Sequence, residues 1–352
     1  NPVEPIVEID GKLQFALPGR PIFPSLGDEN ILKPALAWQI HAPAAAKINA
    51  EVAYVTQGFS WQASYNIVAP EKGDLVDIVG WITMQNDSGS SFQNAKIKLM
   101  AGDVNKVQSS YPQMAKRGFP MMAEMAADAP PVVSEKAFDE FHLYTLANPV
   151  TLRDKETKQV EFIRASGVKA ERLYIYDGAV ISGWRVGMSV GSDPGYGVTS
   201  NKKVHVYREF KNTEANKLGI PLPKGRVRFY SQDNDRQLEF VGENNIEHTP
   251  KEERVRVYIG DSFDLVGERK RTDFKLDEAN HVFEETFEVT LRNRQKEDVE
   301  IRVVEHLFRW TNWTIESKSH EFNKTDAQTI EFHVSLKPDE EKTVTYKARY
   351  TW

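Results

Sequence analysis

The residues around Ser189 match the pattern Gly-x-Ser-x-Gly. In α/β-hydrolases this pattern is the nucleophile elbow, which needs a strand before the serine and a helix after it, so that the hydroxyl is exposed on a strained turn. Here the next residues, 191–197, read Gly-Ser-Asp-Pro-Gly-Tyr-Gly, a composition that cannot start a stable helix. We therefore interpret Gly187–Gly191 as part of a glycine-rich loop and expect no catalytic serine.

Acidic side chains cluster at Asp261 and Asp264, followed by Glu268 and Asp273. A calcium or magnesium site needs six or more oxygen ligands on a tight loop, and apolar residues interrupt these acids. Aspartate also caps turns by bonding the nearby backbone. Turn formation is the main interpretation, and an ion site stays the alternative.

Trp310 and Trp313 lie three residues apart, directly after an arginine. Aromatic side chains on the edge of a β-sandwich can stack on sugar rings, although tryptophan in such domains usually anchors the core. The short run Arg269-Lys270-Arg271 indicates an exposed basic strand face, with an anion site as the alternative. The candidate binding residues are Trp310, Trp313, Asp261, Asp264, Arg269 and Arg271.

The chain has no cysteine, which excludes disulfides, thiolate metal sites and cysteine nucleophiles. Its eight histidines are scattered and form neither H-x-H nor H-E-x-x-H, although folding could gather them. Methionines concentrate in one stretch, at Met114, Met121, Met122 and Met125. That stretch suits a plain linker, an adaptable docking segment or a soft copper(I) site. We expect no cofactor, no metal and no catalytic residue.

The composition is that of a soluble globular protein: 352 residues, 40% hydrophobic and 27% charged. No apolar run approaches the roughly 18 residues of a membrane-spanning helix. A net charge of −6 gives no general attraction to nucleic acid. We expect neither a transmembrane segment nor a nucleic-acid partner, and the oligomeric state stays open.

Alternation with a period of two dominates the chain and indicates strands with one buried face. Apolar residues alternate with polar ones over 330–336 and again over 344–352, on either side of a turn-like Lys337–Glu340. One helical turn is expected at 212–219, with Asn212 as its cap. The sequence predicts an all-β fold of antiparallel β-sandwich domains, the last one immunoglobulin-like.

Composition and strand pattern divide the chain into four segments. Residues 1–104 form an N-terminal β region, and residues 105–137 an Ala/Met/Pro-rich linker or loop. Residues 138–250 form a central β domain, and residues 251–352 the immunoglobulin-like sandwich.

Several motifs occur in a fixed order along the chain. They are Val52–Trp61, Gly80–Ile82, Asn94–Val104, Phe141–Leu146, Leu222–Arg228, Gly260–Lys270 and Val344–Trp352. On these motifs the chain resembles the mucoidy-inhibitor-A-like family of bacteria, whose C-terminal region is a domain of unknown function. The resemblance implies an envelope protein made with a signal peptide and a further N-terminal domain, and it transfers no catalytic residue. A first residue other than methionine agrees with a processed or truncated form.

These observations favour a non-catalytic binding or scaffold protein of the bacterial cell envelope, exported to the periplasm or to another part of the envelope. Its partner would be another envelope protein or a polysaccharide. Two alternatives stay open. An envelope polysaccharide hydrolase would need two acids brought within about 5–10 Å of each other by folding, and a carbohydrate-binding module would need solvent-facing tryptophans.

Overall fold

The computed structural model describes residues 6–15, 39–41, 43–45, 47, 49–70, 73–102, 133–138, 141–181, 193–232, 235 and 237–352. The chain divides into two units, Asn1–Val55 and Thr56–Trp352. The first unit contains a hairpin of β1 (Ile6–Ile9) and β2 (Lys12–Phe15). Asp10 and Gly11 join these strands with φ values of 51° and 72°, which suits the tight turn of a two-residue hairpin.

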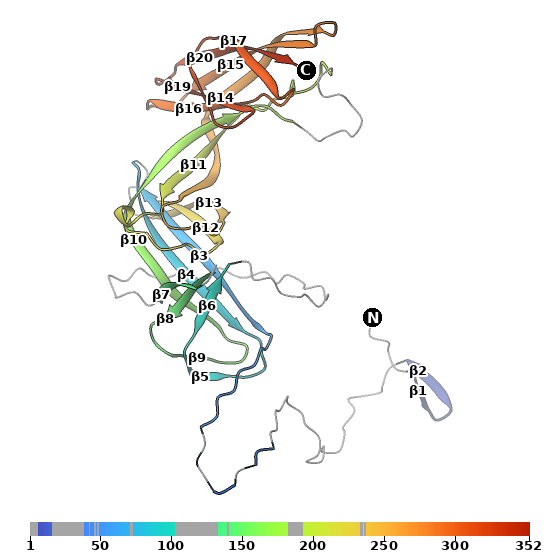
Figure 1. Cartoon of the computed structure of the whole chain (residues 1–352), viewed down its shortest axis with the longest axis vertical. Helices are drawn as coiled ribbons and strands as arrows, with labels where there is room; N and C mark the ends of the chain where they lie inside the picture. The colour runs from blue at the N-terminus through green and yellow to red at the C-terminus, as the bar shows by residue number, and fades with distance from the viewer. Residues whose placement is uncertain are drawn as a thin grey trace. The chain divides into compact units, whose positions relative to one another are not determined.

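The second unit is built from strands (Figure 1). They are β3 (Phe59–Pro70), β4 (Leu75–Asn86), β5 (Phe92–Ala95), β6 (Lys98–Ala101), β7 (Val133–Phe138), β8 (Phe141–Leu146), β9 (Val150–Leu152), β10 (Thr157–Asp177), β11 (Lys203–Lys211), β12 (Gly225–Gln232), β13 (Leu238–Ile246), β14 (Arg254–Asp277), β15 (Val282–Asn293), β16 (Val299–His306), β17 (Asn312–Lys318), β18 (Phe322–Lys324), β19 (Thr329–Leu336) and β20 (Glu341–Thr351). Across the described residues, the single helical element is the 3-10 turn η1 (Glu214–Asn216). The all-β prediction is confirmed.

Most strands join one mixed sheet in the order β13-β12-β3-β4-β10-β11-β14-β15-β20-β17, with β16 pairing β10 and β19, and β18 pairing β19. Two of its pairs, β3 with β12 and β10 with β16, are parallel. These two parallel pairs join strands that lie far apart in the sequence. The sheet is therefore mixed and not purely antiparallel as predicted. Two smaller sheets contain β5 with β9, and β6, β8 and β7.

One hydrophobic core lies against β3, β4 and the first part of β10. Alternate residues of β3 point into it, including Ala63, Tyr65 and Ile67, all at most 2% exposed. The phenol of Tyr65 donates a hydrogen bond of 2.6 Å to the carbonyl of Pro223. Gly80 allows close packing, since a Cβ there would come within 2.6 Å of the Phe162 ring.

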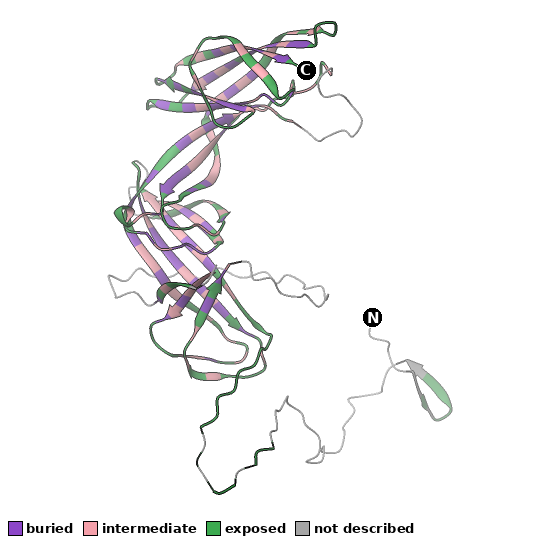
Figure 2. Cartoon of the chain, in the orientation of Figure 1, coloured by how far each residue is buried: buried purple, intermediate pink, exposed green. Residues whose placement is uncertain are grey.

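A second core gathers side chains of β15, β16, β19 and β20, and the alternation predicted for the last two strands is visible as buried and exposed bands (Figure 2). The inward residues of β20 are Val344, Tyr346, Ala348 and Tyr350, each at most 2% exposed. Trp352 departs from the predicted alternation, because it follows the end of β20, stacks on Phe283 and stays 38% exposed.

Two long strands, β10 and β14, contribute side chains to both cores. The boundaries expected at residues 104, 137 and 250 stay predictions. Of the linker 105–137, residues 105–132 lie outside the described residues, while 133–137 belong to β7. The four linker methionines and the Gly187–Gly191 pattern also lie outside the described residues.

The helical turn expected after residue 212 is present but shorter, and its cap differs. Thr213 caps η1 by accepting a hydrogen bond from the backbone of Asn216. Asn212 is instead fully buried and donates to the carbonyls of Ile220 and Pro250, at 2.8 and 2.9 Å. Its amide therefore joins two loops rather than starting the helix.

Candidate functional site

Arg269, placed by β14, forms a buried ion pair with Glu305 of β16. Its Nε lies 2.9 Å from both carboxylate oxygens, and Tyr346 donates to the same carboxylate at 2.5 Å. The exposed fractions of Arg269, Glu305 and Tyr346 are 5%, 0% and 1%. Burial lowers the pKa of Arg269, but the charge of Glu305, the interaction with Tyr346 and the hydrogen bonds to both together outweigh this effect and hold the pKa above its usual value. Arg269 is thus part of the interior and not of an exposed basic face.

Glu285 of β15 is the centre of a second group of ion pairs. One carboxylate oxygen, Oε1, accepts from Arg309 at 2.8 Å and from Arg271 at 3.0 Å. Glu285 and Arg309 are buried, with 3% and 2% of their surface exposed. The side chain of Arg271 is 13% exposed, and its guanidinium carbon lies 4.7 Å from the centre of the Phe274 ring. Both guanidinium groups are therefore fixed by one carboxylate.

All three arginines also hold the turn at residues 193–197 by its backbone. Arg269 donates to the carbonyl of Gly197 at 2.6 Å, and Arg271 donates to the carbonyl of Pro194. Arg309 donates to the carbonyls of residues 193 and 196 at 2.9 and 3.1 Å. We call residues 193–201 the clamped loop.

The turn within the clamped loop is formed by its own sequence. The Asp193 carboxylate accepts from the backbone of Gly195 at 2.8 Å, and the Asp193 carbonyl accepts from the backbone of Tyr196 at 3.2 Å. Gly197 adopts a φ of 69°, which L side chains rarely tolerate. The Asp-Pro-Gly-Tyr-Gly composition therefore supplies the turn that the arginines fix.

The connection between β16 and β17, residues 307–311, lies against the clamped loop through Arg309. On either side of that buried arginine, Phe308 and Trp310 are 41% and 40% exposed. The clamped loop adds Val198, also 40% exposed. We call residues 193–201 and 307–311 the loop pair. Arg269 and Arg309 are buried beneath the loop pair and Arg271 is partly buried there, while aromatic and aliphatic side chains of the loop pair face solvent.

His306 borders the loop pair and makes the stability of the fold depend on pH. Its Nε2 lies 3.0 Å from a carboxylate oxygen of Asp177. The hydrogen bond that His306 donates to Asp177 raises the pKa of His306 above its usual value against the effect of burial, and the charges of Asp177, Glu305 and Asp326 add to this rise. Protonated His306 therefore stabilises the fold below the unfolded pKa, and this contribution is lost as pH rises through the folded pKa.

We expect His306→Gln to reduce the free energy of unfolding more at about pH 5.5 than at about pH 9, since the lost interaction involves the protonated imidazole. Urea unfolding of both proteins at the two pH values measures the difference. A cost that is the same at both pH values would contradict this assignment.

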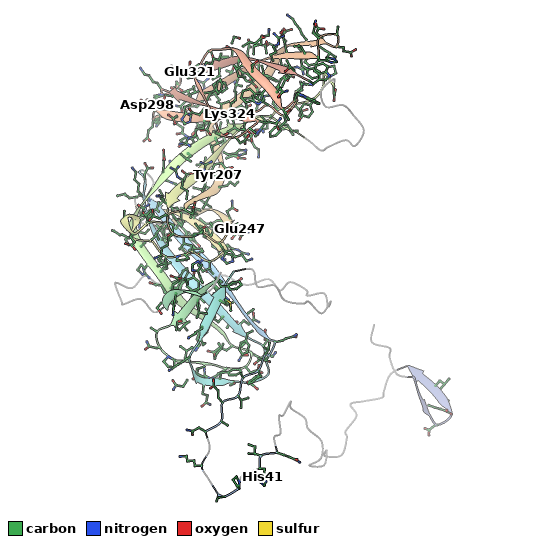
Figure 3. The ribbon with its side chains drawn as sticks, in the orientation of Figure 1. His41, Tyr207, Glu247, Asp298, Glu321 and Lys324 are labelled. Carbon is green, nitrogen blue, oxygen red and sulfur yellow. The ribbon has the colours of Figure 1, made fainter. Side chains whose placement is uncertain are left out.

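Trp313, the other predicted tryptophan, is on β17 and packs against the second core. Its indole donates to the carbonyl of Ala327 at 3.0 Å. The ammonium of Lys324, labelled in Figure 3, lies 4.8 Å from the centre of its ring. The structure therefore places Trp310 at the loop pair and Trp313 mainly in a packing position.

Asp261 and Asp264 both lie within β14, so the turn expected for them is absent. Asp261 lies 2.7 Å from His205, 2.8 Å from the hydroxyl of Tyr258 and 2.8 Å from Lys203. Burial raises the pKa of Asp261, but these hydrogen bonds together have the larger, opposite effect and lower the pKa to about 2. A shift in the pairing of β11 with β14 gathers these groups on the strand face.

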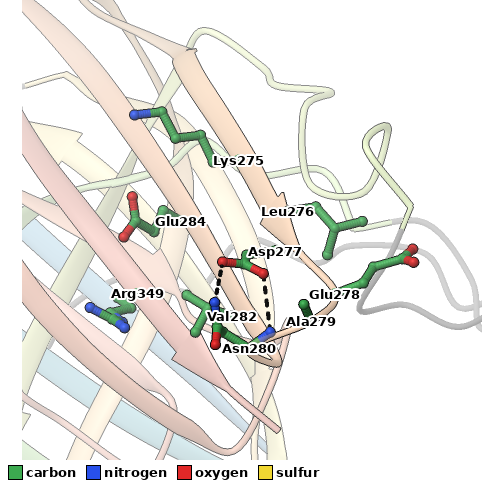
Figure 4. A pocket seen from close by; sticks show the side chains of 9 residues that line it. All are labelled: Lys275, Leu276, Asp277, Glu278, Ala279, Asn280, Val282, Glu284 and Arg349. Carbon is green, nitrogen blue, oxygen red and sulfur yellow. Dashed lines mark hydrogen bonds between the residues drawn. The ribbon is translucent and has the colours of Figure 1, made fainter.

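A concavity of about 890 Å³ lies at the β14–β15 hairpin and is shown in Figure 4. Asp277 closes this hairpin by accepting from the backbone and side-chain nitrogens of Asn280, at 3.0 and 2.8 Å. Lys275, Glu284 and Arg349 line the open side. Of the three acids that line this concavity, Asp277 is engaged in the turn and Glu284 is paired with Lys347 at 2.7 Å, so we assign no chemistry to it.

Over the described ranges, no group of three or more His, Asp or Glu side chains is arranged to hold a metal ion. No helix found there has the length and apolarity to cross a membrane.

The sequence reasoning missed Glu285, Glu305 and Arg309. A signal was present, because Glu305 continues the inward-facing series of β16, after Val303, and Glu285 lies between the inward-facing Phe283 and Phe287. A charged residue at an inward-facing strand position needs a buried partner of opposite charge. The sequence does not reveal which arginine that partner is.

Residues 50–352 match the family model described as a domain of unknown function, DUF4139, and the chain belongs to this family. No curated protein and no solved structure matches.

Proposed function

We propose that this DUF4139 member is a non-catalytic binding or scaffold protein of the bacterial cell envelope, and that the loop pair contacts its partner. One observation carries the proposal. Arg269, Arg271 and Arg309 converge on the carbonyls of the clamped loop. The sheet thereby fixes a surface loop beside the exposed Phe308 and Trp310.

Fixing a loop before binding favours association, because the entropy of ordering it is not lost again in the complex. Exposed aromatic side chains that become covered often supply much of the binding energy of an interface. The loop pair combines both properties, since its backbone is held from below and its aromatic side chains face solvent. A protein partner that covers Phe308 and Trp310 fits this surface.

Burial and pairing of the two acids beneath the loop pair support a binding role over hydrolysis. Glu285 and Glu305 are each bound to arginine and nearly inaccessible. That setting suits a structural ion pair rather than proton transfer to a glycosidic oxygen. The 40% exposure of Trp310 supports a second candidate, a carbohydrate-binding surface on which a sugar ring stacks.

Location in the envelope is supported by the absence of cysteine and by the ordered motifs shared with the mucoidy-inhibitor-A-like family. An immunoglobulin-like sandwich for residues 251–352 is supported by the second core. There, inward residues of β15 and β20 meet those of β16 and β19.

Photo-crosslinking in the native bacterium tests the proposal. A photoreactive amino acid replaces Trp310, and in a control protein it replaces Phe263, which is 96% exposed on β14. We expect a discrete envelope-protein adduct from position 310 and not from position 263. Adducts of equal yield from both positions, or none from 310, contradict a protein-binding loop pair, and an adduct with polysaccharide favours the second candidate.

A further inference from the structure

A second concavity, of about 230 Å³, is lined by β3, β10, β11, β12, β13 and β14, and by none of the residues of the loop pair. Its polar lining includes Arg172, Tyr174, Arg208, Tyr230, Ser262 and Gln295. One water occupies about 30 Å³ in the liquid. The space therefore holds a group larger than a single water or a simple ion.

Arg208 is the least accessible charged residue of this pocket, at 1% exposure. Its Nη1 donates to the carbonyls of Ala170 and Gly73, at 2.8 and 3.1 Å, and lies 3.2 Å from Asp74. Its Nη2 is buried and has no hydrogen-bond partner in the part of the chain that the structure describes. Leaving a buried donor unpaired is destabilising, and more so when the group is charged, so an acceptor from outside the chain would relieve it.

A second arginine lies directly opposite. Arg172 of β10 pairs in register with Arg208 of β11, and like charges across neighbouring strands destabilise a sheet. Burial, and then the charge of Arg172, lower the pKa of Arg208, although Asp74 acts in the other direction. The side chain of Asp74 is 49% exposed, so solvent screening weakens its attraction for Arg208. Two guanidinium groups therefore lie across one strand pair at the wall of this pocket.

The remaining wall offers neutral polar groups in a connected chain. Tyr174 donates to the side chain of Gln295 at 3.5 Å, and Gln295 donates to the hydroxyl of Ser262 at 3.3 Å. Tyr230 adds a ring that packs against Phe240, with ring centroids 5.9 Å apart. Hydroxyl, amide and aromatic groups beside two arginines suit a polar ligand that carries a negative group.

We propose that this pocket binds an oxyanion, the carboxylate or phosphoryl group of a small polar ligand, between Arg172 and the unpaired Nη2 of Arg208. Guanidinium groups bind both anions through charge-assisted hydrogen bonds. Since Nη2 has almost no accessible surface, binding includes a local shift of the pocket wall. The site is independent of the loop pair, and each can fail without the other.

Amide chemical shifts of the full chain, followed during titration with inorganic phosphate and separately with acetate at constant ionic strength, test the proposal. We expect saturable shifts in β10, β11 and β14. Arg172→Gln should weaken binding at least tenfold. The matched control is Arg226→Gln, which removes the same charge from a side chain 55% exposed on β12 and outside the pocket, and should leave affinity unchanged.

Arg208→Lys keeps the charge but removes Nη2, and it should also weaken binding at least tenfold in a protein whose amide spectrum stays folded. Binding of phosphate alone assigns a phosphoryl ligand, and binding of acetate assigns a carboxylate ligand. The proposal is overturned if neither anion binds, or if Arg172→Gln binds as tightly as the parent protein.

Discussion

Replacing Glu305 by glutamine is expected to reduce the free energy of unfolding by about 3–5 kcal/mol, because removing one member of a buried ion pair leaves the other charge uncompensated. Arg269 would keep its buried guanidinium without the carboxylate that lies 2.9 Å from its Nε. Tyr346 would also lose a charged acceptor at 2.5 Å. Urea unfolding of the parent and the variant, followed by tryptophan fluorescence, measures the change.

Glu300→Gln is the matched control, because Glu300 is on the same strand with its side chain 49% exposed and paired with His333. Exposed ion pairs contribute about 0–1 kcal/mol, so this variant should unfold close to the parent. A Glu305→Gln protein that is equally close to the parent would show that the Arg269–Glu305 pair does not support the fold.

Deletion of residues 344–352 is expected to unfold the region around the second core. The deleted part of β20 pairs with both β15 and β17, so its removal breaks two strand interfaces. It also removes Val344, Tyr346 and Tyr350, each at most 2% exposed. Burying one large side chain contributes about 1.5–3 kcal/mol, and a whole domain is stable by only about 5–15 kcal/mol.

Thermal unfolding and size-exclusion chromatography measure this effect, and removal of Trp352 alone is the control, since that residue follows β20 and is 38% exposed. The control should stay monodisperse with a small change in melting temperature. If the longer deletion also stays soluble and melts within a few degrees of the parent, β20 is peripheral to the fold.

Strands could be predicted from the sequence because period-two alternation reports burial on one face. The inward series of β19 and β20 follow it residue by residue, with Trp352 as the exception. The pairing of strands could not be predicted. For example, β10 pairs in parallel with β16, although more than a hundred residues separate the two strands in the sequence. Such pairings depend on long-range packing that no local pattern encodes.

The candidate site was predictable only in part. Trp310 stands out in the sequence as an aromatic beside an arginine and is exposed. The expectation that Arg269-Lys270-Arg271 is an exposed strand face is wrong for Arg269, which is buried, but holds for Lys270. Strand alternation divides this run, placing Arg269 inward and Lys270 outward. The acids that pair with these arginines come from β15 and β16, and only the folded sheet brings them together.

The central claim is that the loop pair is a fixed binding surface, and the affinity for the partner captured at position 310 tests it most directly. The dissociation constant would be measured for the parent, for the double variant Phe308→Ala/Trp310→Ala, and for Phe263→Ala as the exposed control. We predict binding at least tenfold weaker for the double variant and unchanged for the control. Equal dissociation constants for all three proteins would contradict the account.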